Sequence, residues 1–287
     1  MTDPASQNVG PVLDDHLHLD PLEGRNQEAV RAFDAMGGTH LLVVNKPSWS
    51  LGVEVDSPED FRTGFDLTCE AVAAASRLLR GRAWPVLGVH PALISRLCER
   101  GWSPTAAREL METGLDVAAE YVERGDALAL KSGRPHYEVA DAIWAASNEV
   151  MCHAFELAAQ AGCAVQLHTE TGSDLDQLTS WARTRGLDAQ QVVKHFAGPE
   201  THGPVPSVVA REENILGAIE ADRPFMLETD FIDDPDRPGA VLGPKTVPKR
   251  TAWLRSEGYV EAVRQANVTT PARVYGIDTE ATLDGRS

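Results

Sequence analysis

The chain has 287 residues, with 43 Asp and Glu against 26 Lys and Arg and a formal net charge of −17. This acidic excess disfavours a nucleic-acid partner, because affinity for nucleic acids comes largely from basic groups that meet phosphates. No apolar run reaches the roughly 20 residues that a membrane-spanning helix needs.

The sequence favours a single domain over residues 1–287, located in the cytosol. Residues 1–11 are polar and lack the basic and apolar regions of a secretion signal. The four cysteines are scattered and form no metal or redox motif, so we expect them to be reduced and mostly buried. We expect a small molecule as the substrate and no membrane as a partner; a homo-oligomer is compatible with the sequence.

Short aliphatic segments alternate with longer segments of helical character, which is typical of βαβ units. In chain order, we expect strands at 12–19, 40–45, 84–90, 127–131, 164–170, 192–196, 205–210 and 225–231. We expect helices at 26–36, 57–81, 103–125, 140–160, 174–184, 212–221, 251–257 and 259–266. Ser57-Pro58 and Ser103-Pro104 each combine a capping serine with a proline at the first helical position.

These eight strands with intervening helices predict an α/β fold, a (β/α)8 TIM-type barrel. The Gly-rich dinucleotide-binding fingerprint is absent from the sequence, which counts against an open doubly wound sheet.

The first strand carries an unusual pair of histidines. Alternation along a strand puts His16 and His18 on one face with Val12 and Asp14, and puts Leu13, Leu17 and Leu19 on the other. Two imidazoles on one face can bind a single metal ion. Taken alone, such a pair is more often one hydrogen-bonded core histidine and one exposed histidine.

Further chemical groups stand where the expected strands end. In a TIM-type barrel the active site lies at these carboxyl ends. The groups in question are His16, His18, His90, Lys131, His168, His195 and Asp230. Each of them alone has a structural explanation, but their joint placement at the strand ends predicts a metal site there.

The chain resembles the TatD-related branch of the amidohydrolase superfamily over nearly its whole length. The matching motifs are Asp14-x-His16-x-His18, Gly88-Val89-His90-Pro91, Gly133 two places after the strand-four position, His168, His195 and Glu228-Thr229-Asp230. This resemblance implies a two-metal centre. By this analogy His16, His18 and Asp230 hold one metal, His168 and His195 hold the other, and a strand-four group bridges them.

The sequence departs from this family at Lys131, where TatD-type enzymes have a bridging glutamate. An ammonium group about 4 Å from a dication is repelled by roughly 8 kcal/mol at an effective dielectric constant near 20. Other branches of the superfamily bridge their metals with a lysine carboxylated by carbon dioxide, and this is the reading we prefer for Lys131. The alternative is a one-metal site in which the Lys131 ammonium turns toward an acidic residue.

A second departure is Glu170, which stands where nuclease-like members have an arginine suited to a phosphate. A carboxylate facing the substrate would repel a phosphodiester and suit a cationic or hydrogen-bond-donating substrate. The alternative is that Glu170 orients a metal ligand or pairs with Arg134. We expect His90, Arg134, His136 and Glu170 around the mouth of the site as substrate or leaving-group contacts.

We therefore expect a metal-dependent hydrolase that cleaves a C–N bond (amide, imide or amidine) or an ester or lactone bond of a small molecule. Asp230 would transfer the proton of the attacking water, and Lys131 would bridge the metals. Histidine and carboxylate ligands suit Zn²⁺ best, although Mn²⁺, Fe²⁺, Co²⁺ and Ni²⁺ are also compatible. The alternatives are a TatD-like phosphodiesterase or deoxyribonuclease, and a metal-binding protein without catalysis.

Two peripheral features have open interpretations. The Pro- and Gly-rich loop 233–248 follows the last strand, and Lys245 within it and Lys249 and Arg250 just after it either bind a substrate anion or are simply solvated. Trp49, after the second strand, either walls the pocket or packs on a neighbouring loop or subunit.

Overall fold

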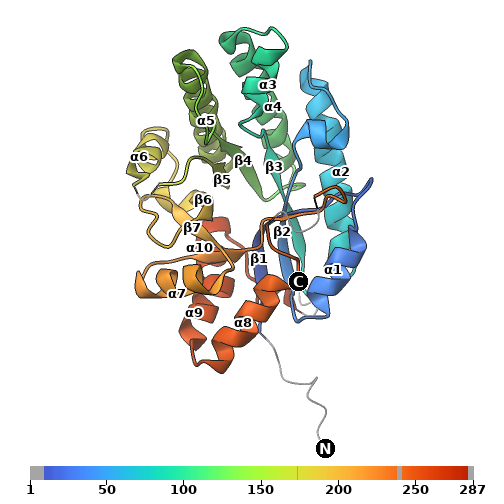
Figure 1. The fold of residues 1–287 in the computed structure, drawn as a ribbon, viewed down its shortest axis with the longest axis vertical. Coiled ribbons are helices and arrows are strands. Elements are labelled where there is room, and N and C mark those ends of the chain that lie inside the picture. Colours follow the sequence, from blue (N-terminus) through green and yellow to red (C-terminus); the bar gives the residue numbers. More distant parts are fainter. Residues whose placement is uncertain (1–9, 173, 238–240, 284–287) are drawn as a thin grey trace, which may run out of the picture.

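Parallel strands form the centre of the computed structural model, which describes residues 10–172, 174–237 and 241–283 (Figure 1). The sheet order is β8-β7-β6-β5-β4-β3-β2-β1-β9, and every pairing is parallel. The strands are β1 (Leu13–His18), β2 (His40–Val44), β3 (Ala83–Gly88), β4 (Ala129–Gly133), β5 (Ala164–His168), β6 (Val192–Ala197), β7 (Val205–Val209), β8 (Met226–Glu228) and β9 (Phe231–Ile232).

The two ends of this sheet meet, because β8 and β9 are consecutive in the chain and only Thr229 and Asp230 separate them. β8 pairs with β7, and β9 pairs with β1 through Leu17 opposite Phe231. The eighth strand predicted from the sequence is thus split into two short strands that pair with different neighbours. The curled parallel sheet confirms the predicted TIM-type α/β fold.

Helices surround the strands, as Figure 1 shows. They are α1 (Gln27–Asp34), α2 (Pro58–Ser76), α3 (Leu93–Glu99), α4 (Pro104–Glu123), α5 (Asp141–Ala161), α6 (Asp176–Thr184), α7 (Glu212–Glu220), α8 (Thr246–Ser256), α9 (Val260–Arg264) and α10 (Thr270–Tyr275). Shorter turns are η2 (Ser48–Leu51), η3 (Ala189–Gln191) and the π-helical η4 (Gln265–Thr269), which joins α9 to α10. None of the helices in the described part of the chain is long and apolar enough to cross a membrane.

The predicted helix starts are confirmed at two serines. Ser57 and Asp60 form a reciprocal capping box at the start of α2, and the Ser103 hydroxyl accepts the Ala106 N–H at 3.1 Å at the start of α4. The predicted elements do not include η2, α3 and α10, and the predicted helix 251–257 begins five residues after the start of α8. The reason for the late start is Pro248, which lies in the first turn of α8, where proline is tolerated.

One apolar cluster fills the lower interior of the barrel, that is, the part away from the carboxyl ends of the strands. Each of the strands β1 to β8 contributes to it. Its strand residues are Leu13, Leu42, Val44, Trp84, Val86, Ala129, Ala164, Val193, Val205 and Met226. Val274 and Ile277 from the C-terminal segment complete this cluster. Apolar side chains therefore occupy the lower interior, and the polar interior residues described below lie toward the carboxyl ends of the strands.

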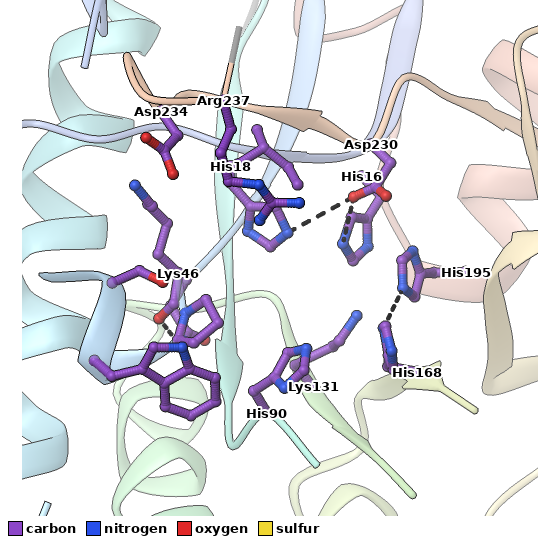
Figure 2. Close-up of a pocket in the computed structure, with 15 residues that line it drawn as sticks. His16, His18, Lys46, His90, Lys131, His168, His195, Asp230, Asp234 and Arg237 are labelled. Atoms are coloured by element: carbon purple, nitrogen blue, oxygen red, sulfur yellow. Dashed lines mark hydrogen bonds and ion pairs between the residues drawn. The ribbon is translucent and has the colours of Figure 1, made fainter. Parts of the chain in front are cut away.

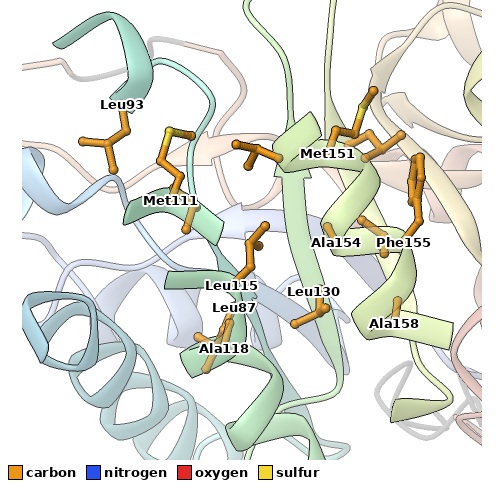
Figure 3. Close-up of a cluster of buried hydrophobic side chains, with 14 of the residues drawn as sticks. Leu87, Leu93, Met111, Leu115, Ala118, Leu130, Met151, Ala154, Phe155 and Ala158 are labelled. Carbon is orange, nitrogen blue, oxygen red and sulfur yellow. The ribbon is translucent and has the colours of Figure 1, made fainter. Parts of the chain in front are cut away.

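A second core lies between the strands and the helices outside them (Figure 3). Leu87 of β3 and Leu130 of β4 point outward into it and are fully buried. They belong to one cluster with Leu115 of α4 and Phe155 of α5. This packing holds β3 and β4 rigidly beside the site, because interiors packed at this density transmit displacements rather than absorb them.

The predicted faces of the first strand are partly wrong. Leu13 lies in the barrel interior, whereas Leu17 and Leu19 pack outward against Phe33 of α1. Residues four apart share a face in a regular strand, but the pairing of β1 with β2 shifts register between Asp14 and Leu17. A β-bulge of this kind re-aims the side chains beyond it, and bulges are frequent next to active sites.

A substitution at Gly88 tests whether β3 and β4 approach each other as closely as the structure shows. A Cβ atom at this position would lie 1.9 Å from the carbonyl oxygen of Lys131. We expect Gly88→Ala to lower the free energy of unfolding in urea by at least about 1–3 kcal/mol, because the two strands must move apart. Gly243→Ala is the matched control, since a Cβ there meets nothing within 4 Å; equal stability of the two variants would contradict this packing.

Candidate metal centre

A cavity of about 220 Å³ opens at the carboxyl ends of the strands (Figure 2). All seven strand-end residues predicted from the sequence line it: His16, His18, His90, Lys131, His168, His195 and Asp230. Its remaining walls come from residues after β2 and from the loop after β9. The structure thus brings together groups that lie more than 200 positions apart in the chain.

His16, His18 and Asp230 form a compact group whose candidate ligand atoms lie within 4.8 Å of one another. The Nε2 atoms of His16 and His18 lie 4.0 and 3.8 Å from Oδ1 of Asp230. Burial, reinforced by the charge of Lys131, lowers the pKa of both imidazoles, that of His18 to about 4. Both rings are therefore neutral at neutral pH, the form in which imidazole binds a metal.

The outer nitrogens of these two histidines have fixed partners. His18 Nδ1 donates to the carbonyl oxygen of Val44 at 2.9 Å. His16 Nδ1 donates to Oε1 of Gln166 at 2.7 Å, while the Gln166 amide nitrogen donates to the Tyr275 hydroxyl at 2.8 Å. Each Nε2 therefore carries a lone pair, and His16 Nε2 is buried without a hydrogen-bond partner among the described residues. An orphaned buried lone pair of this kind fits a bound cation.

Asp230 owes its position to the break in the eighth strand. Its φ of 46° lies in the left-handed region, which is rare for a residue other than glycine. The Asp230 N–H donates to the carbonyl oxygen of His16 at 3.0 Å, and the preceding Thr229 hydroxyl donates to Asp14 at 2.6 Å. These bonds tie the acid directly to β1, the strand that carries the two histidines.

His168 and His195 form a second group. His168 Nδ1 and His195 Nε2 lie 2.8 Å apart, and burial lowers the pKa of both rings. The Phe196 N–H donates to Glu228 Oε1, so this oxygen is an acceptor and His195 Nδ1 donates to it at 3.3 Å. If the His168 proton moved from Nδ1 to Nε2, where His136 Nδ1 lies 2.8 Å away, two converging lone pairs would remain, the arrangement that a shared cation needs.

Two further residues, His136 and Glu228, lie next to this pair. His136, expected as a substrate contact, places Nδ1 2.8 Å from the outer nitrogen of His168. Glu228 was noted only as part of a motif, yet His16, His195 and Glu228 form a second buried group able to hold a cation. Alternation along the strand, two places before Asp230, was the signal that could have identified Glu228.

Lys131 lies inside β4 rather than at its end, because the strand runs on to Gly133. Its side chain is buried and lines the cavity, and Figure 2 shows the amine directed between the two histidine groups. Burial lowers the pKa of this amine to about 7, although the charges of Asp230 and Glu228 oppose the shift. The direction of this shift favours the uncharged amine.

Glu170 and Arg134, both expected as substrate contacts, are paired with each other. Arg134 Nε donates to Glu170 at 2.8 Å, Nη2 makes a second bond to the same carboxylate, and Nη1 donates to Asn148 at 3.0 Å. The guanidinium group lies between the rings of Trp144 and Trp181. Neither Arg134 nor Glu170 lines the cavity described above, which agrees with the alternative reading of Glu170.

Trp49 and the loop after β9 complete the cavity wall. His90 lies 4.8 Å from His168 between ring centres, and Trp49 meets His90 edge to face. In the loop 233–248, Arg237 lines the cavity and Lys245 does not; Lys249 and Arg250, which lie on α8, do not line it either. The sequence shows basic residues in and after this loop but not which of them faces the site, because that depends on the turn that the loop makes.

A family model and a related protein each match nearly the whole chain. The family model described as TatD related DNase matches residues 13–276. An uncharacterized protein of Methanocaldococcus jannaschii is 32% identical over 282 residues, which cover 94% of this chain and 97% of that protein.

Solved structures share the fold at low sequence identity. A TatD-like protein from Archaeoglobus fulgidus is 18% identical with a TM-score of 0.58, over 92% of this chain and 100% of that chain. An organophosphorus hydrolase from Deinococcus radiodurans is 16% identical with a TM-score of 0.56, over 92% of each chain. A variant of a PTE-like lactonase from the same organism is 17% identical with a TM-score of 0.57, over 92% of this chain and 95% of that chain.

Gln166 tests whether the His16 lone pair is held in place for a cation. We expect Gln166→Met to weaken Zn²⁺ or Co²⁺ binding by about 10–100-fold, because His16 Nδ1 loses its acceptor and the ring can turn. Competition with a chromogenic chelator measures the affinity. Gln190→Met, at an exposed position away from the cavity, is the control; unchanged affinity in Gln166→Met would show that the bond does not matter for metal binding.

Proposed function

Because the chain belongs to the TatD-related DNase family, whose fold is that of metal-dependent hydrolases, we propose that it hydrolyses a C–N or ester bond of a small molecule at a two-cation centre. The observation that carries this proposal is the convergence of neutral imidazoles, with lone pairs free, on the carboxylate of Asp230. This donor set suits Zn²⁺, and Mn²⁺, Fe²⁺, Co²⁺ and Ni²⁺ accept the same ligands.

We assign the ligands in two groups. His16, His18 and Asp230 would hold one cation, and His168 and His195 the other. Bound divalent cations supply Lewis acidity and lower the pKa of a water molecule. The outer partners of the histidines, among them Gln166 and Glu228, support this assignment because they leave the inner nitrogens available.

Asp230 is the residue we assign to proton transfer. Burial raises the pKa of its carboxyl group to about 6, while the charges of Lys131 and Arg237 oppose the shift. Bound cations would lower this pKa again, so the role rests on the position of the carboxylate beside the candidate cation sites. Asp230 would accept the proton of the attacking water and deliver it to the leaving nitrogen or oxygen.

Lys131 would bridge the two cations as a carbamate. The neutral amine attacks carbon dioxide, an N–C bond forms, and one proton is released, which leaves a carboxylate on the side chain. The pKa of about 7 supports this reaction, because only the unprotonated amine is nucleophilic. The carbamate also removes the repulsion that an ammonium group would meet beside two dications.

A phosphodiesterase is the second candidate, and one feature of the structure favours it. The carboxylate of Glu170 is paired with Arg134 and does not line the cavity, so it does not oppose a phosphate there. The cavity of about 220 Å³ and the net charge of −17 still favour a small molecule over a nucleic acid.

Asp230→Asn tests the proposed chemistry. With saturating Zn²⁺ or Mn²⁺, we expect kcat on the best substrate of a panel of lactones, amides and esters to fall by about 10²–10⁴-fold, because proton transfer is lost. Asp141→Asn, an exposed substitution on α5, should leave kcat unchanged. A nitrophenyl phosphodiester and DNA belong in the same panel, and preferential cleavage of either would favour the second candidate.

Lys131 variants test the bridge. We expect wild-type protein to bind two Zn²⁺ per chain in bicarbonate, Lys131→Glu to keep both, and Lys131→Met to lose one, since glutamate supplies a carboxylate that can join two dications and methionine supplies none. Metal analysis after gel filtration gives the stoichiometry. In Lys131→Ala, propionate should restore the second metal by supplying a carboxylate. Two metals retained in Lys131→Met would rule out Lys131 as the bridge.

A further inference from the structure

The outer half of the cavity carries a cation that the proposed chemistry does not use. Arg237 lies in the loop after β9 and lines the cavity together with His18 and Trp49 (Figure 2). We propose that Arg237 forms a subsite for an anionic group of the ligand, a carboxylate or a phosphate, next to the metal centre. This inference rests on the proposed function, since it takes the cavity to be the substrate site.

Two other basic side chains at or near the cavity, Lys46 and Arg134, already have acidic partners. Lys46 also lines it, but its ammonium group donates to Asp20 at 2.7 Å and to the carbonyl oxygen of Asp233 at 3.2 Å, and it is almost fully buried. Arg134 is held by Glu170 and Asn148. Among the described residues no carboxylate lies within ion-pair distance of Arg237, and Asp230 experiences its charge only from farther away.

The loop presents Arg237 through a defined turn. The Asp234 carboxylate accepts the N–H of Asp236 at 2.9 Å, and the Asp234 carbonyl accepts the N–H of Arg237 at 3.1 Å. The turn thus uses one carboxylate oxygen of Asp234, which itself lines the cavity. Arg237 is exposed and lines the same cavity as the metal-centre residues, so its guanidinium group is accessible to a ligand there.

A flat apolar wall accompanies this charge. The Trp49 ring is fixed by the guanidinium group of Arg96, 4.8 Å from its centre, and by the His90 ring, 5.6 Å away. Pro47 and Ile232 also line this part of the cavity. A guanidinium group binds carboxylate or phosphate oxygens in pairs, and an aromatic wall favours a planar or apolar body.

The ligand class follows from this combination. At about 220 Å³ the cavity is smaller than the roughly 300–1,000 Å³ of sites for drug-sized ligands. It suits a compact acid that carries a small planar or apolar body next to the bond to be cleaved. Glu170 does not oppose such an anion, because Arg134 already compensates its charge.

The subsite is tested by ligand binding to the metal-free, full-length protein, which removes direct metal–anion contact. The probes are benzoate, phenyl phosphate and the neutral benzamide, titrated by calorimetry or ligand-observed NMR. We expect at least one of the two anions to bind about tenfold or more tightly than benzamide. The stronger anion identifies a carboxylate or a phosphate as the source of the charge.

Variants of Arg237 test whether this residue causes the preference for the anion over benzamide. Arg237→Gln should abolish the preference for the anion, whereas Arg237→Lys should keep part of it. Arg211→Gln, the same change of charge at an exposed position outside the cavity, should behave as the wild type. Circular dichroism and thermal unfolding check that each variant folds.

The proposal is overturned if the wild type shows no preference, if no probe binds at millimolar concentration, or if the preference survives in Arg237→Gln. These outcomes are independent of turnover. A preference for anions without hydrolysis would leave the subsite standing and remove the proposed function. Hydrolysis without the preference would do the reverse.

Discussion

The carboxyl half of the barrel encloses more polar groups than its own side chains satisfy. His16, Lys131, Glu228 and Asp230 are all buried or nearly so, and burial is the largest cause of the pKa shift at each of them. Removing such groups from water is costly unless each one finds a partner. The other residues of the site supply hydrogen-bond partners that reduce the cost of this burial. They leave the inner imidazole nitrogens without a proton.

Those partners act by orienting the imidazoles. Val44, Gln166, Glu228 and His136 each occupy the outer nitrogen of a different histidine, so that the inner nitrogens converge on the cavity. Gln166 in turn is held by Tyr275, the last residue of α10. The C-terminal segment therefore has two roles. It completes the apolar cluster in the barrel interior, and it supports His16 through the hydrogen bonds from Tyr275 to Gln166 and from Gln166 to His16.

Two irregularities of the sheet bring the acid to the histidines. The bulge in β1 re-aims the side chains after Asp14, and the break between β8 and β9 places Asp230 in a left-handed conformation. Both interruptions are secured by hydrogen bonds between the same two segments, from Asp230 to His16 and from Thr229 to Asp14. Regular strands would have buried more backbone hydrogen bonds but would not have joined these three ligands at one point.

The sequence by itself determined the fold class and the inner members of the site. Helical and strand periodicity predicted the barrel, and the rule that active sites lie at strand ends selected the residues that line the cavity, from His16 to Asp230. These signals are local, because each depends only on the order of residues within one element. Only the tertiary structure decided that Leu13 points inward, that Arg134 neutralises Glu170, that Gln166 and Tyr275 support His16, and that Arg237 faces the cavity. Each of these depends on contacts between segments far apart in the chain or on the course of a loop, which no local pattern of residues encodes.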